Sequence, residues 1–306
     1  MANRKIFDLS TDPYRINISN SDLPISTIFS QTFSDGEHHM FVDKSVEGDD
    51  VTLILSTVTA DDWLRLLLVI EAIKSAGSKR ITVVMPYMGY ARQDKYLRSG
   101  TPESSFRGLA KLLESSGVDR IITIDVHSER IKEFFKTVEL HSISAQPLLC
   151  DNIRSLYKAK FQSESLVIVA PDKGSIPLAN QYLSQLSEID VSLATIIKKR
   201  NQANKIAAMD LSGNVDGKVA IIVDDMADTC GTLIAAAALL KSSGAKVVYA
   251  AVTHPIFSGD ALTKLATSDL EKIFVTDTVG TVPKHVKIEM VSVLPIVVQE
   301  LSKLDS

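Results

Sequence analysis

The stretch KVAIIVDDMADTCGTLIAAAALL, residues 218–240, joins a Val/Ile run to an alanine-rich run through an acidic turn. The Val/Ile run predicts a strand buried on both faces, and the alanine-rich run predicts a helix. In an open parallel sheet, ligands bind beyond the carboxyl ends of the strands, and Asp224 and Asp225 fall at such an end. The stretch therefore predicts an α/β fold with a binding site at this point.

Apolar runs of the same kind recur along the chain and alternate with helical patterns. The other strand-like runs are VTLILST, ITVVMPY, RIITIDV, LVIVAPD and VVYAAVTH. Helices are predicted for DDWLRLLLVIEAIKSAG, ESSFRGLAKLLESSG and TLIAAAALLKSSG, each ending at a glycine suited to a left-handed cap. Because this design repeats on both sides of the midpoint, we expect two similar open, mostly parallel-sheet domains, residues 1–145 and 146–306. The boundary is expected near residues 142–150, with the last helix able to pack back onto the first domain.

Composition narrows the classes of function. The 306 residues are 45% hydrophobic and 23% charged, with a formal net charge of −4. A negative total charge disfavours a nucleic-acid partner, and no run approaches the ~20 apolar residues of a membrane helix. The two cysteines, Cys150 and Cys230, favour neither a disulfide framework nor a zinc cluster. We expect a soluble, cytoplasmic protein.

The turn after the strand has the chemistry of an anion site. Residues 228–232, DTCGT, open a helix, so backbone N–H groups and two hydroxyls can converge on a phosphate. Carboxylates beside a phosphate repel it unless they accept hydrogen bonds from hydroxyls or hold a divalent cation, and a ribose phosphate offers both. The alternative is a solvated acidic turn in which Thr229 caps the helix.

This stretch resembles the phosphoribosyl-pyrophosphate (PRPP) loop of two families, the type I phosphoribosyltransferases and the ribose-phosphate pyrophosphokinases. The transferases consume PRPP, whereas the pyrophosphokinases make it from ribose 5-phosphate and ATP. The resemblance implies that ribose 5-phosphate binds at Asp224, Asp225, Asp228, Thr229, Cys230, Gly231 and Thr232.

Four further segments resemble the pyrophosphokinases in order and spacing. FSDGE (residues 33–37) and PYMGYARQDK (residues 86–95) look like the ATP site, which implies roles for Phe33, Asp35, Glu37, Arg92 and Gln93. TIDVHSERIKEFF places His127 at the magnesium and phosphate centre, in contact with ATP, and VAPDKGS supplies Asp172 as its metal partner. KKRNQAN matches the mobile catalytic segment and supplies Lys198 and Arg200.

The resemblance implies a duplicated phosphoribosyltransferase-like fold. The first domain would carry most of the ATP site, and the second the ribose 5-phosphate loop and the catalytic segment. The implied reaction is a Mg²⁺-assisted attack of the ribose O1 on the ATP β-phosphorus, with Lys198, Arg200 and His127 as catalytic residues. Two residues apart in an extended segment, Lys198 and Arg200 are expected to share a face.

Each of these residues also has a simpler interpretation. His127 can be a structural histidine, residues 198–200 a solvated basic run, and Phe33 the anchor of a hairpin tip.

Glu129, Arg130 and Lys132 depart from the small or amide residues of regulated relatives, which puts control by phosphate and ADP in doubt. Two other functions therefore remain open, a catalytically silent regulatory subunit and a type I phosphoribosyltransferase.

The resemblance also implies a homo-oligomer, either a dimer or a ring of dimers. In this family the FSDGE loop typically completes the ATP site of a neighbouring subunit. The chain adds one observation of its own. The helix around Trp63, WLRLLLVIEAI, is apolar on more than one face, as an interface helix or a buried helix would be.

Overall fold

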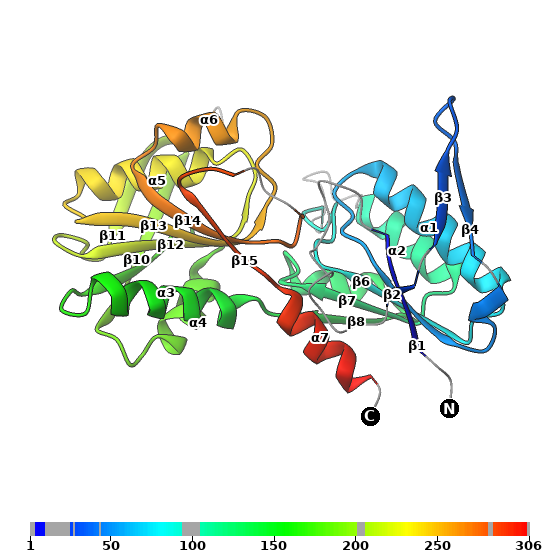
Figure 1. The fold of residues 1–306 in the computed structure, drawn as a ribbon. Helices are drawn as coiled ribbons and strands as arrows, with labels where there is room; N and C mark the ends of the chain where they lie inside the picture. The colour runs from blue at the N-terminus through cyan, green and yellow to red at the C-terminus, as the bar shows by residue number, and fades with distance from the viewer. Residues whose placement is uncertain are drawn as a thin grey trace. The chain divides into compact units, whose positions relative to one another are not determined.

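The computed structural model describes residues 4–9, 25–26, 28–42, 44–93, 105–200, 206–280 and 284–304. The chain forms two compact units. The first comprises residues 1–144, 278–281 and 294–306, and the second comprises residues 145–277 and 282–293. Each unit is built on its own sheet (Figure 1).

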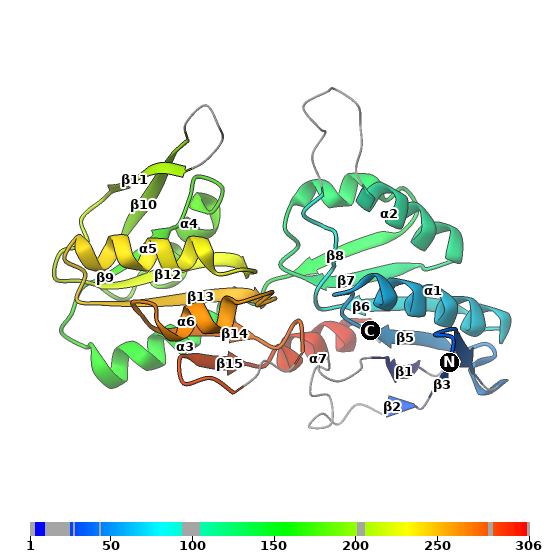
Figure 2. The same cartoon turned by 90° about the horizontal axis from the view of Figure 1, so that it is seen from above.

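The first unit contains a six-stranded sheet in the order β2-β1-β5-β6-β7-β8, in which every described pair is parallel. Its strands are β1 (Arg4–Asp8), β2 (Ile25–Ser26), β5 (Asp50–Ile54), β6 (Arg80–Met85), β7 (Arg120–Ile124) and β8 (Glu139–Ile143). Figure 2 shows β5 to β8 side by side. A separate antiparallel hairpin, β3 (Phe29–Thr32) and β4 (His38–Phe41), projects beside α1 (Figure 1).

Helices cover both faces of this sheet. The helices α1 (Ala60–Ser75) and α2 (Ser105–Ser116), with the 3₁₀ turn η3 (Glu129–Phe134), pack on one face, and α7 (Leu294–Lys303) lies on the other (Figure 1). A second 3₁₀ turn, η2 (Lys44–Val46), precedes β5. A capping box starts α1, because Thr59 Oγ1 accepts from Asp62 N at 3.2 Å and Asp62 Oδ2 accepts from Thr59 N at 2.7 Å.

The second unit contains a seven-stranded sheet in the order β11-β10-β9-β12-β13-β14-β15. Only the β10–β11 pair is antiparallel among the described pairs. Its strands are β9 (Leu166–Ala170), β10 (Val191–Arg200), β11 (Ile206–Ser212), β12 (Val219–Ala227), β13 (Val247–Pro255), β14 (Leu270–Thr276) and β15 (Ile288–Val291). The helices α5 (Gly231–Ser242) and α6 (Ala261–Ala266) cover one face, and α3 (Gln146–Lys160) and α4 (Ile176–Gln185) cover the other.

The predicted fold class is confirmed by these two mostly parallel open sheets. Every residue of β9 is buried, as is the first half of β12, because helices pack on both faces of the sheet. The glycines that end the predicted helices, Gly77, Gly117 and Gly244, adopt positive φ angles of 88°, 90° and 93°. The helix α7 belongs to the first unit although it ends the chain. None of the described helices is long and apolar enough to cross a membrane.

Candidate active site

The proposed site begins on β12. Asp224 and Asp225 lie inside this strand rather than just beyond it, because β13 continues to pair with β12 as far as Ala227 opposite Pro255. Side chains alternate along a strand, so the two carboxylates start out on opposite faces of the sheet. Both residues are partly exposed.

A single hydroxyl group links two of the acidic residues. Ser175 Oγ lies 3.0 Å from Asp224 Oδ1 and 3.3 Å from Asp172 Oδ1. Asp172 Oδ1 also accepts from Gly174 N at 3.0 Å, and Asp224 Oδ1 accepts from Asp225 N at 3.1 Å. Burial, then the charge of Asp225 and to a lesser degree that of Asp172, raise the pKa of Asp224 to about 7. This cluster favours a bound cation or a hydroxyl donor.

The turn that follows β12 ends in a left-handed residue. Cys230 has a φ of 60° and is the N-cap of α5, but its side chain makes no capping hydrogen bond. The prediction that Thr229 is the N-cap is therefore wrong, whereas the solvated acidic turn stays an alternative, and Thr229 is exposed. Gly231 and Thr232 form the first turn of α5, whose N–H groups suit an anion. Burial and the charge of Asp228 raise the pKa of the Cys230 thiol to about 11, which disfavours a reactive thiolate.

His127 lies just beyond the carboxyl end of β7, in the first unit. Its side chain is exposed. The backbone before it turns sharply, because Asp125 has a φ of 37° and Val126 N donates to Ser142 Oγ at 3.1 Å. Asp172 lies in the second unit, two residues beyond β9. The two predicted metal ligands thus follow the carboxyl ends of strands in different units.

The segment 33–37 forms the tip of the β3–β4 hairpin. Phe33 N donates to the carbonyl of Glu37 at 2.8 Å, and Glu37 N donates to Asp35 Oδ1 at 3.1 Å. Phe33 stacks on His39 with ring centroids 6.1 Å apart, yet 46% of Phe33 remains exposed. The tip thus presents a half-exposed aromatic ring and two acidic residues.

The segment with Arg92 and Gln93 follows β6 and is shaped by a close backbone approach. A Cβ on Gly89 would lie 2.0 Å from the Thr57 carbonyl oxygen, so only glycine fits there. Gly89 N also donates to Thr57 Oγ1 at 3.1 Å. Arg92 and Gln93 are both exposed. The end of this predicted segment, residues 94–95, lies outside the described residues.

Lys198 and Arg200 lie on β10, where the backbone pairs with β11. Lys198 is opposite Met209 and Arg200 is opposite Ile206. The register shifts between Lys199 and Arg200. The prediction that Lys198 and Arg200 share a face concerns side chains that lie outside what the structure describes. The rest of the predicted catalytic segment, residues 201–204, lies outside the described residues.

Comparison with known proteins identifies the family. Residues 13–117 match the N-terminal domain of ribose phosphate pyrophosphokinase, and residues 139–281 match the phosphoribosyl transferase domain. The ribose-phosphate pyrophosphokinase of Burkholderia pseudomallei is 39% identical over 259 residues, covering 84% of this chain and 79% of that protein. The chain belongs to the ribose-phosphate pyrophosphokinase family.

Other pyrophosphokinases agree with this assignment. Ribose-phosphate pyrophosphokinase A of Dictyostelium discoideum is 41% identical over 258 residues, covering 83% of this chain and 78% of that protein. The crystal structure of phosphoribosylpyrophosphate synthetase from Mycobacterium smegmatis superposes with a TM-score of 0.87 at 30% identity, covering 99% and 98% of the two chains. The match to the N-terminal pyrophosphokinase domain argues against a type I phosphoribosyltransferase.

The carboxylate of Asp172 in the second unit fits a magnesium ion whose other ligands come largely from a bound substrate and water. In the part of the chain that the structure describes, no three or more His, Cys, Asp or Glu side chains are grouped to hold a metal. Mg²⁺ commonly takes one or two protein carboxylates and completes its shell with phosphate oxygens and water. Asp172, whose carboxylate is already oriented by Gly174 N and Ser175, is suited to such a role.

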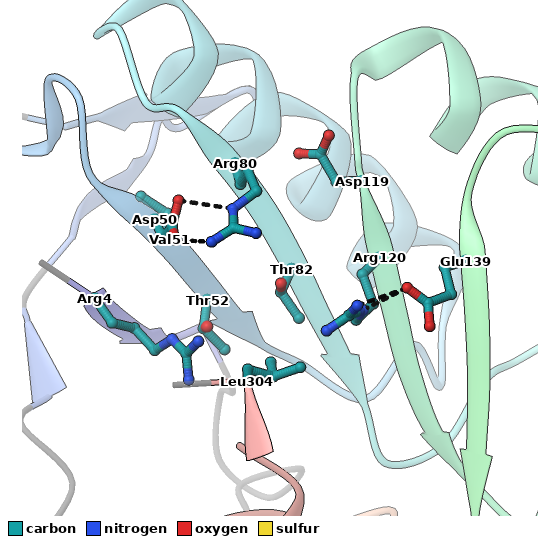
Figure 3. Close-up of a pocket in the computed structure, with 10 residues that line it drawn as sticks. All are labelled: Arg4, Asp50, Val51, Thr52, Arg80, Thr82, Asp119, Arg120, Glu139 and Leu304. Carbon is teal, nitrogen blue, oxygen red and sulfur yellow. Dashed lines mark hydrogen bonds and ion pairs between the residues drawn. The ribbon is translucent and has the colours of Figure 1, made fainter. Parts of the chain in front are cut away.

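A cavity of about 110 Å³ lies at the opposite, amino-terminal ends of the first unit's strands (Figure 3). It is lined by Arg4, Asp50, Val51, Thr52, Arg80, Thr82, Asp119, Arg120, Glu139 and Leu304. None of the predicted site residues lines it. Its guanidinium groups already have partners, since Arg80 donates to Asp50 and Arg120 donates to Glu139. We therefore assign no ligand to this cavity.

Sequence reasoning missed Ser175 as a site residue. Its hydroxyl lies between the carboxylates of Asp172 and Asp224, which are 52 positions apart in the numbering. The only signal was local, a serine three residues after an acidic residue at the start of a helix. That pattern predicts a capping interaction, and the pairing with β12 appears only in the folded sheet.

Proposed function

We propose that the chain is an active ribose-phosphate pyrophosphokinase, which makes PRPP and AMP from ribose 5-phosphate and ATP. The observation that carries this proposal is the group formed by Asp172, Ser175 and Asp224, because Asp224 lies on the strand that leads into the left-handed turn at Cys230. Acidic groups suit ribose hydroxyls and a cation, and the start of α5 suits the 5-phosphate. The first unit would hold ATP and the second ribose 5-phosphate.

The proposed chemistry is a pyrophosphoryl transfer. The ribose O1 forms a bond to the β-phosphorus of ATP while the bond from that phosphorus to the oxygen bridging to the α-phosphorus breaks. This oxygen leaves on AMP, and the O1 proton is lost to solvent. Lys198 and Arg200 would stabilise the negative charge that accumulates on the phosphoryl oxygens.

The remaining proposed roles concern binding and orientation. Asp224, Asp225 and Asp228 would orient the sugar, while the turn at residues 229–232 would hold its phosphate. Phe33, Asp35, Glu37, Arg92 and Gln93 would bind the nucleotide. His127 and Asp172 would hold Mg²⁺, which supplies charge neutralisation for the phosphates when bound.

We also propose that the active form is a homo-oligomer in which the β3–β4 hairpin reaches the ATP site of a second copy. Phe29 and Phe41 on this hairpin are 72% and 54% exposed, which is unusual for large aromatic side chains. A mixture of two inactive variants, Phe33→Ala and Arg92→Ala, should regain activity, because mixed oligomers contain sites with neither substitution. Light scattering of each variant alone checks that assembly is intact.

A cytoplasmic location is consistent with the two cysteines, which are free and buried. ATP is also an intracellular substrate. Localisation of a fluorescent fusion, with protease protection as a control, tests this part of the proposal.

Incubation with ATP, Mg²⁺ and ribose 5-phosphate tests the activity directly. Chromatography should show AMP and PRPP in equal amounts, only when the sugar phosphate is present. ADP as the accompanying product would contradict pyrophosphoryl transfer. Binding of both substrates without turnover would instead indicate a silent regulatory subunit.

A further inference from the structure

The loop after β13 is bonded to the turn after β12. Pro255 ends β13 opposite Ala227 and cannot donate a backbone hydrogen bond. The next backbone N–H groups that bond to the β12 side come from residues beyond the end of β13. Phe257 N donates to the Ala227 carbonyl at 2.9 Å, and Ser258 N donates to the Asp228 carbonyl at 3.1 Å. The two loops are therefore joined where the ribose-phosphate turn begins.

A third bond joins the side chains. Ser258 Oγ donates to Asp228 Oδ1, so one serine holds both the carbonyl and the carboxylate of Asp228. A charge-assisted hydrogen bond of this kind is stronger than a neutral one. It fixes the direction of the carboxylate that stands two residues before Cys230.

The backbone conformation of Phe257 indicates that this arrangement is imposed by its surroundings. Phe257 has a φ of 47°, a left-handed conformation that is unfavourable for a bulky residue. Its side chain packs against the core beneath α5 and α6. This conformation directs two successive N–H groups onto the turn. The two bonded loops thus each contain a left-handed residue, Phe257 in the supporting loop and Cys230 in the turn.

We infer that Ser258 is a positioning residue for the ribose-phosphate turn. It keeps the Asp228 carboxylate directed away from the 5-phosphate and holds the entry to the turn, so that the turn is preformed before the sugar phosphate arrives. This inference rests on the proposed ribose 5-phosphate site and adds a residue outside the turn itself. Preorganisation of this kind raises affinity because the turn loses less conformational entropy on binding.

The test compares Ser258→Ala with a matched control, Ser268→Ala. Ser268 also lies in a loop of the second unit, and its hydroxyl donates to the Leu265 carbonyl at 2.7 Å, away from the turn. Calorimetric titration should show ribose 5-phosphate binding about tenfold weaker in Ser258→Ala, with ATP affinity within twofold of the wild type. Ser258→Thr, which keeps the hydroxyl, should recover most of the affinity. The KM for ribose 5-phosphate should rise in parallel while kcat stays within about twofold.

Equal affinities of Ser258→Ala and Ser268→Ala for ribose 5-phosphate would overturn the inference. A parallel loss of affinity for ATP and for ribose 5-phosphate in Ser258→Ala would also overturn it, because such a loss indicates general damage to the fold. Unfolding midpoints of all three variants identify such damage. If the wild type makes PRPP and Ser258→Ala binds ribose 5-phosphate as tightly as the wild type does, this inference alone is overturned. If the wild type binds ribose 5-phosphate but forms no PRPP, the proposed activity is overturned. The affinities of Ser258→Ala and Ser268→Ala for ribose 5-phosphate then still decide the role of Ser258. A wild type that does not bind ribose 5-phosphate overturns both.

Discussion

Two sheet edges in this molecule carry several charged residues, and they are arranged in opposite ways. At the amino-terminal edge of the first unit's sheet, Arg80 donates to Asp50, and Arg120 Nε donates to Glu139 at 2.8 Å. At the carboxyl-terminal edge of the second unit's sheet, the described partners of Asp224 are two neutral donors, Ser175 Oγ and Asp225 N. We call these the paired edge and the acidic edge.

The pKa shifts at the two edges have opposite signs. The hydrogen bond from Arg80 lowers the pKa of Asp50, so ionised Asp50 stabilises the fold and this contribution is lost on acidification. Burial raises the pKa of Asp224 to about 7, so ionised Asp224 costs stability in the free protein. The difference teaches that Asp50 and Glu139 each have a guanidinium partner at the paired edge, whereas the described partners of Asp224 are neutral, which suits the ligand that we propose for the acidic edge.

The largest effect should come from removing the cations proposed to act beside the acidic edge. Lys198→Ala and Arg200→Ala should each lower kcat by about 100-fold or more, while KM changes only a few-fold, because their interactions are strongest in the transition state. Lys199→Ala, between them, is the matched control and should stay within about threefold of the wild type. An effect confined to KM would contradict the assigned role.

Substitutions in the turn should separate the two substrates. Asp228→Ala removes a proposed acceptor for a sugar hydroxyl, and Thr232→Ala removes a proposed donor to the phosphate. Each should weaken ribose 5-phosphate binding by about tenfold, the cost of one hydrogen bond that involves a charged group. ATP binding should change less, since the residues proposed to bind the nucleotide lie in the first unit. Calorimetric titration with each substrate measures both constants. If ATP binding falls more than ribose 5-phosphate binding, the phosphate site is misplaced.

The stability of the substrate-free protein should respond to Asp224→Asn. The unfolded carboxyl has its ordinary pKa of 3.8 and the folded one about 7, so the folded state holds the extra proton between them. Wild-type stability should therefore fall as pH rises from about 4 to about 7, and Asp224→Asn should reduce this fall. At pH 8 the variant should be more stable than the wild type, by up to a few kcal/mol.

Urea unfolding of both proteins at pH 5 and pH 8 measures this difference. The same substitution should weaken ribose 5-phosphate binding, because the amide oxygen is a poorer acceptor than a carboxylate. A variant that is less stable than the wild type at pH 8 would show that Asp224 is compensated within the free protein. The contrast between the two edges would then be wrong.

The smallest effect is expected at the paired edge. Glu139→Gln removes one partner of a largely exposed ion pair, in which 63% of the Glu139 side chain is accessible. The free energy of unfolding should fall by at most about 1 kcal/mol, and kcat and KM should not change. Denaturant unfolding and steady-state kinetics measure the two quantities. A loss of activity would give the cavity of Figure 3 a function that we do not assign to it.

Local sequence features predicted most of the fold. Strands such as β9 are recognisable because a sheet covered on both faces requires unbroken apolar runs, and glycines such as Gly244 mark helix ends because they adopt positive φ. The extension of β12 to Ala227 was not predictable, since it depends on how far β13 keeps pairing. The register shift after Lys199 is likewise set by β11.

The candidate site was predictable only in part, for the same reason. The turn after β12 is contiguous in sequence, so its chemistry could be read from residues 228–232 alone. Ser258 contacts Asp228 in this turn from 30 residues away in sequence, and Ser175 contacts Asp224 on β12 from 49 residues away. No local pattern marks either serine as a site residue. Their roles arise from the order of β9, β12 and β13 in the sheet.

The most direct test of the central claim follows the label from [γ-³²P]ATP in the presence of Mg²⁺ and ribose 5-phosphate. Pyrophosphoryl transfer predicts that the label appears in PRPP, with one AMP formed for each labelled PRPP. Label in a sugar product formed together with ADP, or label released only as inorganic phosphate, would contradict the account.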